Sequence, residues 1–282
     1  PPRSTLFPYT TLFRSADVLV LASPALELLA VIGGASALIA SLVLLTQTAV
    51  KVQLAWSTIA QMGFMLLQCG LGAFSSALLH IVAHSLYKAH AFLSSGSIMD
   101  LARASWTPSP GGQPHPARLV VALAAVVGLT LAVAWLFGAT PLSNPARIAL
   151  GCVLLMGLVH LVANTIDERL NTFVIARTGV TAAAVAGLYF ALQMGMEAAV
   201  GSSVPTGSLV GGSVGFAIAA LVVVSFGAVT VFQNQMMRRA DAPFWIAAYV
   251  HLENGLYLNT LSNRLVLAVW PRRFSRASSA RT

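Results

Sequence analysis

The sequence predicts an all-α protein, a polytopic bundle of about seven transmembrane helices followed by one amphipathic helix. Three observations support this fold class. Of the 282 residues, 57% are hydrophobic and only 9% are charged, whereas soluble globular chains carry about 25% charged residues. The hydrophobic residues are gathered in long runs, and basic residues separate these runs. The chain therefore carries too little charge to cover a water-facing surface.

The hydrophobic runs are long enough to cross about 30 Å of hydrocarbon at 1.5 Å per residue. A very short turn near Gly70 joins the second run to the third, which predicts a tight antiparallel hairpin. Stretches rich in Pro and Gly follow the third and sixth runs and are expected to be loops. The runs are residues 24–46, 52–72, 73–99, 118–137, 147–165, 172–194 and 209–232.

Residues 1–15 read PPRSTLFPYTTLFRS and use Thr-Leu-Phe twice. They have neither a continuous apolar core nor a cleavage-site pattern, so they are not a signal peptide. We expect them to be a non-native scar from a translated sequencing adapter; the alternative is a short natural tail. If they are a scar, the N-terminal part of the protein is missing. The transmembrane bundle is then expected to occupy residues 16–240.

Basic residues alternate between the two ends of the predicted helices. One set of loops is rich in them, whereas the opposite set holds little beyond Arg147 and contains the acidic Glu197. The positive-inside rule places the basic set in the cytoplasm. We therefore predict a multi-pass protein of the bacterial inner membrane with a cytoplasmic C-terminus. The basic set is Lys51, Arg103, Arg118, Arg169, Arg177, Arg238 and Arg239.

The residues that point to function are His80, His84 and Lys88, spaced four apart in an otherwise apolar run. Each four-residue step turns only about 40° around an α-helix, so the three side chains share one face. Ionisable residues at membrane depth are costly and mark proton or ion paths by default, and histidine changes charge near neutral pH. We interpret the line as a stepwise proton relay bridged by water. The alternative is that the histidines only hold the bundle together through hydrogen bonds.

Two further basic residues are candidates for the same path. Lys51 lies just before the second run. It either faces inward as a group through which protons enter, or it anchors the helix at the membrane interface, with its aliphatic chain along the lipid and its amine in water. His160 lies alone within the fifth run. It is either a downstream relay residue or a structural one.

Other chemistries find no support in the sequence. His80 and His84 have the spacing of a zinc pair, but position 81 is Ile where the helical zinc-protease motif has Glu, so we predict no metal site. Cys69 and Cys152 lie in apolar runs and are interpreted as core residues. The basic residues behind the net charge of +8 are scattered, which predicts no nucleic-acid partner. Neither a nucleophile elbow nor a Gly-rich dinucleotide motif is present, so we predict no catalytic site and no cofactor.

Residues 241–271 differ in character from the runs before them. An apolar stripe that includes Trp245, Tyr249 and Leu256 is mixed with His, Glu, Asn and Arg. This segment is too polar to span a membrane, and we predict an amphipathic helix that lies on membrane lipid or docks on a partner. Trp245, Tyr249 and Leu256 are the expected docking residues. Residues 272–282 are basic and Ser-rich and are expected to be disordered.

Two stretches carry a family resemblance: residues 50–65, which read VKVQLAWSTIAQMGFM, and the His80-x3-His84-x3-Lys88 line. Together they resemble the proton-translocating antiporter-type membrane subunits, which include the L-type subunit of respiratory complex I and the A subunit of multisubunit sodium/proton antiporters. Lys51 and the three relay residues match that pattern. Residues 61–70, 85–96 and 249–257 are most similar to the DabB-type branch, the membrane subunits of inorganic-carbon uptake systems.

The resemblance implies a proton-conducting subunit of a CO2/bicarbonate uptake complex. Its implied partner is a large, soluble, zinc-containing, carbonic-anhydrase-like subunit of the DabA type on the cytoplasmic side, to which zinc and catalysis would belong. The alternative is an L-type complex I subunit or an antiporter A subunit. Those relatives carry a functional lysine on the next helix, whereas residues 119–137 contain no ionisable side chain. The N-terminal half of the family pattern is absent, so we expect the C-terminal half of such a subunit.

Overall fold

The computed structural model describes residues 12–94, 116–138, 145–163, 172–205, 213–238 and 242–269. Within these ranges the chain forms helices joined by short turns, and none of the described residues is in a β-strand. The predicted all-α fold class is therefore confirmed.

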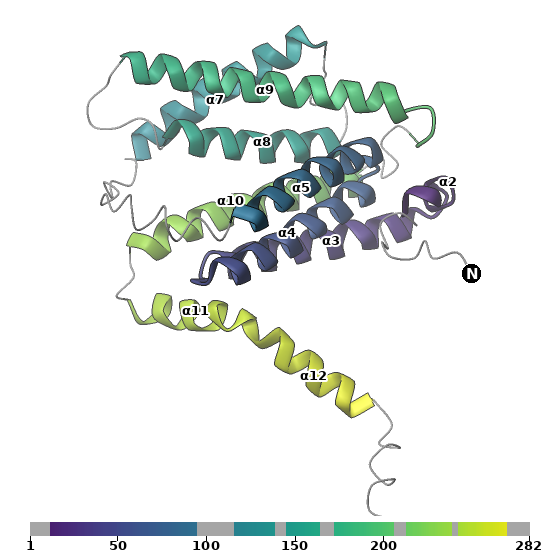
Figure 1. Cartoon of the computed structure of the whole chain (residues 1–282), viewed down its shortest axis with the longest axis vertical. Helices are drawn as coiled ribbons and strands as arrows, with labels where there is room; N and C mark the ends of the chain where they lie inside the picture. Colours follow the sequence, from purple (N-terminus) through teal and green to yellow (C-terminus); the bar gives the residue numbers. More distant parts are fainter. Residues whose placement is uncertain are drawn as a thin grey trace, which may run out of the picture.

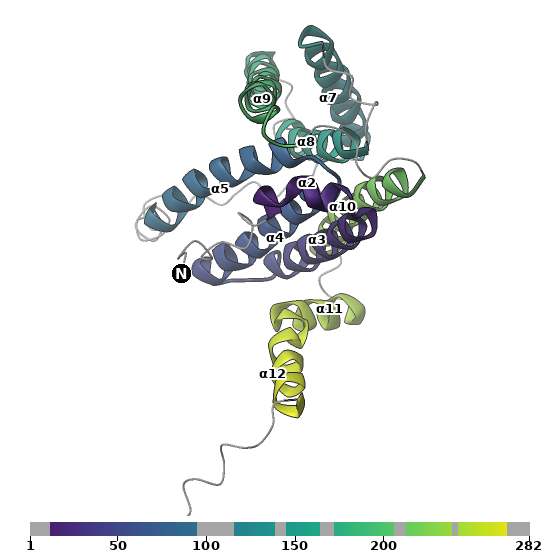
Figure 2. The same cartoon turned by 90° about the vertical axis from the view of Figure 1, so that its right-hand side faces the viewer.

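The helices form two groups that pack on each other, with a C-terminal arm to one side (Figures 1 and 2). The first group contains α3, α4, α5 and α10, and the second contains α7, α8 and α9. Contacts of α8 with α10 and of α5 with α9 join the two groups. The elements are α2 (Ala16–Val20), α3 (Ser23–Leu44), α4 (Val50–Gly70), α5 (Phe74–Ser94), α7 (Pro116–Leu136), α8 (Pro145–Ala163), α9 (Thr172–Val200), α10 (Ser213–Arg238), α11 (Pro243–Glu253), the 3-10 turn η1 (Gly255–Tyr257) and α12 (Leu258–Val269).

Each predicted run corresponds to one helix, from α3 to α10. By length and composition, α3 and α9 are the described helices that meet the requirement for crossing a bilayer. In α7, α8 and α10 the apolar stretches whose side chains the structure describes are shorter, at residues 121–136, 146–159 and 214–229. The glutamine, serine, histidine and lysine side chains of α4 and α5 lower the hydropathy of those two helices. Helix composition alone therefore does not confirm about seven membrane helices.

Among the described helices, α3 and α4 pack most closely, and they meet through glycines. A Cβ atom added to Gly63 would lie 2.6 Å from the Ala37 backbone nitrogen and 2.8 Å from the Gly33 carbonyl oxygen. A Cβ on Gly70 would overlap the backbone nitrogen of Ala30. Small residues let two backbones approach this closely, as they do between membrane helices. This contact fixes α4 against α3 and leaves another face of α4 for α5.

Buried side chains from several helices form the core around this pair. Ala30 of α3 and Leu67 of α4 belong to one cluster with Ala149 of α8 and Val222 of α10. A second cluster joins α7, α8 and α9 through Val126, Leu158, Val159, Ala182 and Ala186. The site described below therefore rests on a helix held by packing on more than one side.

The described part of residues 1–15 contacts the bundle. The Phe13 ring packs edge-on against Phe74, with 6.3 Å between the ring centroids. Residues 1–11 lie outside the described part of the chain. That residues 1–15 are non-native remains a prediction.

The C-terminal segment, residues 243–269, is not the single amphipathic helix that was predicted. It consists of α11 and α12, and Gly255, Leu256 and Tyr257 between them all have positive φ angles of 61°, 52° and 55°. Asn-Gly is a helix-ending signal, because glycine adopts the left-handed conformation at low cost. The break lies against the main bundle: Gln47 Nε2 donates to the Glu253 carbonyl at 3.1 Å. Residues 272–282 lie outside the described residues.

Candidate functional site: a polar line between α4 and α5

The predicted relay residues lie on the α5 face that meets α4. The polar side chains of α4 that face them are Ser57, Gln61 and Gln68. Because α4 and α5 form an antiparallel hairpin, the C-terminal relay residue of α5 lies opposite the N-terminal part of α4. Hydrogen bonds between the two helices therefore build one polar line inside an otherwise apolar hairpin.

Lys88 forms one end of this line and is only 6% exposed. Its ammonium Nζ donates to the Leu54 carbonyl oxygen at 2.9 Å and to the Ser57 hydroxyl. The Tyr87 ring lies 5.9 Å from the same nitrogen. Neutral oxygens bind an ammonium less strongly than a carboxylate does. This arrangement suits an amine that has to take up and release a proton.

His84 lies next along the line and is 9% exposed. Its Nε2 atom is buried and has no hydrogen-bond partner among the described residues. A buried polar atom left without a partner costs about 1–3 kcal/mol, so such atoms require an explanation. Its imidazole meets that of His80 edge-on, with 6.2 Å between the ring centroids. A water molecule at Nε2 would satisfy this atom and join the two histidines.

His80 has a partner at each ring nitrogen. Nδ1 lies 3.1 Å from Gln68 Oε1, and Nε2 lies 2.6 Å from Gln61 Oε1. With both carboxamide oxygens facing the ring, both nitrogens donate, which is the imidazolium form. Turning one carboxamide over presents its NH2 group to a bare ring nitrogen and suits the neutral form. The two glutamines can therefore serve either protonation state of His80.

The structure places the other predicted residues in different surroundings. Lys51 lies in the first turn of α4 and is exposed. The backbone of His160 belongs to α8, but its side chain lies outside the described part. Trp245 packs against Phe232, with 5.1 Å between ring centroids. Trp245, Tyr249 and Leu256 are all half-buried.

Sequence reasoning missed the α4 partners Ser57, Gln61 and Gln68. A signal was available, because spacings of four and seven residues place them on one face of α4. Each is uncharged and common in helices, so none stood out as the ionisable residues of α5 did. Within the described ranges, no group of three or more His, Cys, Asp or Glu side chains is arranged to hold a metal ion.

Comparisons with known proteins first show similarity to a class of membrane proteins. Residues 5–106 match the NADH:quinone oxidoreductase/Mrp antiporter transmembrane family. The matched stretch contains α3, α4 and α5, and thus the whole polar line. The matched stretch begins at residue 5, within the segment that was predicted to be non-native.

Individual proteins that are similar to this chain over most of its length belong to the DabB-type branch. The chain is 34% identical over 267 residues to the probable inorganic carbon transporter subunit DabB2 of Halothiobacillus neapolitanus, covering 94% of this chain and 48% of that protein. It is 33% identical over 263 residues to the probable inorganic carbon transporter subunit DabB of Hydrogenovibrio crunogenus, covering 92% of this chain and 47% of that protein. These matches confirm the resemblance to DabB-type subunits. The chain spans about half the length of these curated relatives.

A shorter match reaches the respiratory branch. Over 74 residues the chain is 39% identical to NADH-quinone oxidoreductase subunit L of Rickettsia felis, covering 26% of this chain and 12% of that protein. Similarity to a proton-antiporter-like membrane subunit is therefore shown. Similarity over most of this chain is found with the DabB proteins.

Proposed function

We propose that this protein is a proton-conducting, multi-pass subunit in the inner membrane that belongs to an inorganic-carbon (CO2/bicarbonate) uptake complex. The observation that carries the proposal is the Lys88–His84–His80 line, in which neutral polar groups of α4 hold Lys88 and His80 and the buried His84 lies between them. Similarity to DabB proteins over more than nine-tenths of the chain supports the inorganic-carbon role. The whole protein's substrate and partner are part of this proposal.

The line suggests how a proton moves. A proton that reaches His80 passes through water to His84 and then to Lys88, which releases it near the N-terminal part of α4. Each step transfers one proton between a nitrogen and a water, so the charge of each residue is restored after a transfer. Gln61 and Gln68 accommodate both forms of His80, and Ser57 holds the Lys88 amine. Lys51 is proposed to exchange protons with bulk water at this end.

Positions of charged residues support the proposed topology. Arg147 at the start of α8 and Glu197 near the end of α9 lie 3.7 Å apart, so these helix ends share one side. Gln47 after α3 contacts Glu253 at the end of α11, so the break between α11 and α12 lies near the α3–α4 turn and Lys51. The positive-inside rule assigns the Lys51 side to the cytoplasm. The Arg147–Glu197 side then faces outward, and about seven helices cross the membrane.

A second candidate function is a proton-pumping L-type subunit of complex I or an A subunit of a cation/proton antiporter. The family match, which includes the polar line, and the 74-residue similarity to a subunit L favour it as an alternative. The sequence of α7 contains no lysine, although the respiratory relatives are expected to carry one there. Neighbouring genes distinguish the two: a large zinc-site protein supports carbon uptake, and a set of quinone-oxidoreductase subunits supports the alternative.

The direct test uses the complete gene product that contains this chain, expressed with its proposed cytoplasmic partner in bacteria without carbonic anhydrase. We expect growth in air, and accumulation of radiolabelled inorganic carbon that stops within minutes of adding a protonophore. Accumulation that persists at a collapsed proton gradient would contradict the proposal. Proton pumping that requires NADH and quinone would identify the alternative function instead.

The C-terminal arm is the proposed contact with the partner. On α12, Leu258, Leu261 and Leu265 form an exposed apolar stripe, and Asn259 and Asn263 lie beside it. Unpartnered apolar stripes of this kind mark contacts with protein or lipid. Because Trp245, Tyr249 and Leu256 are half-buried, we propose that they seat the arm while the α12 stripe contacts the DabA-type partner.

We expect Leu261→Ser combined with Leu265→Ser to release the partner from isolated membranes while the membrane subunit stays in place. Sedimentation of membranes followed by detection of the partner measures this release. Asn259→Ser with Asn263→Ser is the matched control on the polar face of α12 and should retain the partner. Partner retention by the leucine variant at wild-type amounts would indicate a lipid anchor rather than a docking surface.

A further inference from the structure

The polar stripe of α5 continues beyond the relay toward the start of the helix. Ser76 lies four residues before His80, on the same face, and is 5% exposed. Its hydroxyl accepts a hydrogen bond from Gln193 Nε2 of α9. Gln193 therefore occupies a lone pair of the Ser76 oxygen and directs the hydroxyl hydrogen elsewhere. Residues four apart on a helix have Cβ atoms roughly 5–6 Å apart, a distance that one water bridges.

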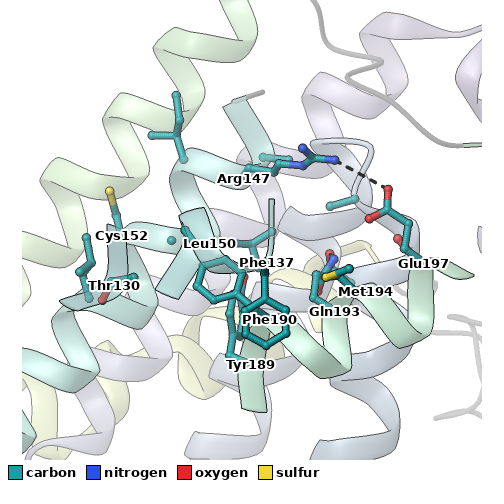
Figure 3. Close-up of a pocket in the computed structure, with 18 of the residues that line it drawn as sticks. Thr130, Phe137, Arg147, Leu150, Cys152, Tyr189, Phe190, Gln193, Met194 and Glu197 are labelled. Atoms are coloured by element: carbon teal, nitrogen blue, oxygen red, sulfur yellow. Dashed lines mark hydrogen bonds and ion pairs between the residues drawn. The ribbon is translucent and has the colours of Figure 1, made fainter. Parts of the chain in front are cut away.

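Ser76 and Gln193 border a partly open cavity of about 550 Å³, lined by the start of α5 and by α7, α8 and α9 (Figure 3). Phe137 and Phe190 stack with 6.1 Å between their centroids and form part of its apolar lining. The same cavity is lined by the Arg147–Glu197 ion pair, whose side chains are 48% and 44% exposed. The cavity thus connects the buried Ser76 hydroxyl with groups that reach solvent.

The lining of this cavity is mostly apolar, but it carries polar groups that can hold water. A volume of about 30 Å³ per liquid water leaves room for on the order of ten molecules. The lining supplies the Thr130 and Tyr189 hydroxyls, the Gln193 carboxamide and the ion pair. Buried waters need two to four polar partners each, which these groups and neighbouring waters provide.

We propose that this cavity is a water-filled vestibule from which the Ser76 hydroxyl passes protons to His80, with Gln193 as its positioning residue. The inference rests on the proposed proton-conducting function and adds the outer end of its path. Ser76 takes a proton from a cavity water as its own hydrogen passes to the water beside His80, so no net charge remains on the oxygen. The half-exposed Glu197 carboxylate exchanges protons between the cavity and the outer solution.

The water content of the cavity can be tested without reference to proton flow, because Cys152 lines it. A charged, membrane-impermeant thiosulfonate added outside right-side-out vesicles of the complete gene product should modify Cys152. Modification should vanish in Cys152→Ser, should not occur at the buried Cys69, and should resemble that of the exposed position in Ser203→Cys. Protection of Cys152 from this reagent, with labelling by a lipid-soluble maleimide, would show a dry cavity and overturn the proposal.

The role of Ser76 is tested by proton flux in proteoliposomes. Ser76→Ala should lower the flux at least about tenfold, which corresponds to one weakened transfer step, while Cys152 remains accessible. Ser85→Ala removes a hydroxyl from the same helix at an exposed position off the stripe, and its flux should equal that of the wild type. Gln193→Met should lower the flux as well, whereas Leu192→Met on the exposed face of α9 should not.

Different results would contradict the vestibule and the proposed proton-conducting function. If Ser76→Ala conducts as the wild type does but Lys88→Met does not, the vestibule is wrong and the relay stands. If both variants conduct normally, the proposed proton-conducting function itself is wrong.

Discussion

Replacing Lys88 with methionine is expected to abolish proton flux and growth in air while leaving the subunit in the membrane. Methionine keeps a long apolar stem but removes the amine that donates to Leu54 and Ser57. A positioned acid–base group contributes about 10²–10⁴ to a transfer rate, so the loss should be at least about a hundredfold. Flux in proteoliposomes and membrane content measured by immunoblot are read on the same samples.

Two further variants separate a relay from a purely structural amine. Lys88→Arg keeps a positive charge near the same oxygens, but arginine does not release its proton at any working pH, so this variant should fail as well. His90→Ala removes an ionisable, exposed side chain from the same helix but off the stripe and should behave as the wild type does. Wild-type flux in Lys88→Arg would show that Lys88 supplies charge or packing and is not a relay member.

The sequence predicted the α5 half of the site because ionisable residues are rare in apolar runs and their four-residue spacing is visible. Periodicity alone places His80, His84 and Lys88 on one face, and the structure puts all three toward α4. The α4–α5 hairpin could also be predicted from the sequence, because only a few residues near Gly70 separate two long apolar runs. Confirmation of the all-α class follows from the same physical constraint on backbone hydrogen bonds in apolar surroundings.

Other parts of the structure could not be predicted, because they depend on contacts between residues distant in sequence. Gln193 meets Ser76 across 117 positions, and no local pattern indicates that pairing. The arm was predicted as one helix because its apolar residues follow a helical period, which conceals the break at Gly255. The Asn254-Gly255 step indicated that a helix could end there. The positive φ angles of Leu256 and Tyr257 could not be predicted, because residues other than glycine rarely adopt a positive φ.

The largest structural effect is expected from Gly63→Ala, one methyl group between α3 and α4. The added Cβ would lie 2.6 Å from the Ala37 nitrogen and 2.8 Å from the Gly33 carbonyl oxygen, both of them backbone atoms. A side chain can rotate away from such a contact, but here two helix backbones have to separate. Overpacking typically costs about 1–3 kcal/mol, and we expect the upper part of this range, seen as a lower midpoint of thermal unfolding in detergent.

Gly179→Ala is the matched control, because no atom of a neighbouring described residue lies within 4 Å of its Cβ position on α9. There, removing a helix glycine should stabilise the protein by about 0.5–1 kcal/mol, so the two substitutions should shift the midpoint in opposite directions. Gly63 lies two residues after Gln61, so separating α3 from α4 also displaces the carboxamide from His80 and should lower proton flux. A Gly63→Ala protein as stable and as conductive as the wild type would show that the α3–α4 contact does not set the position of the polar line.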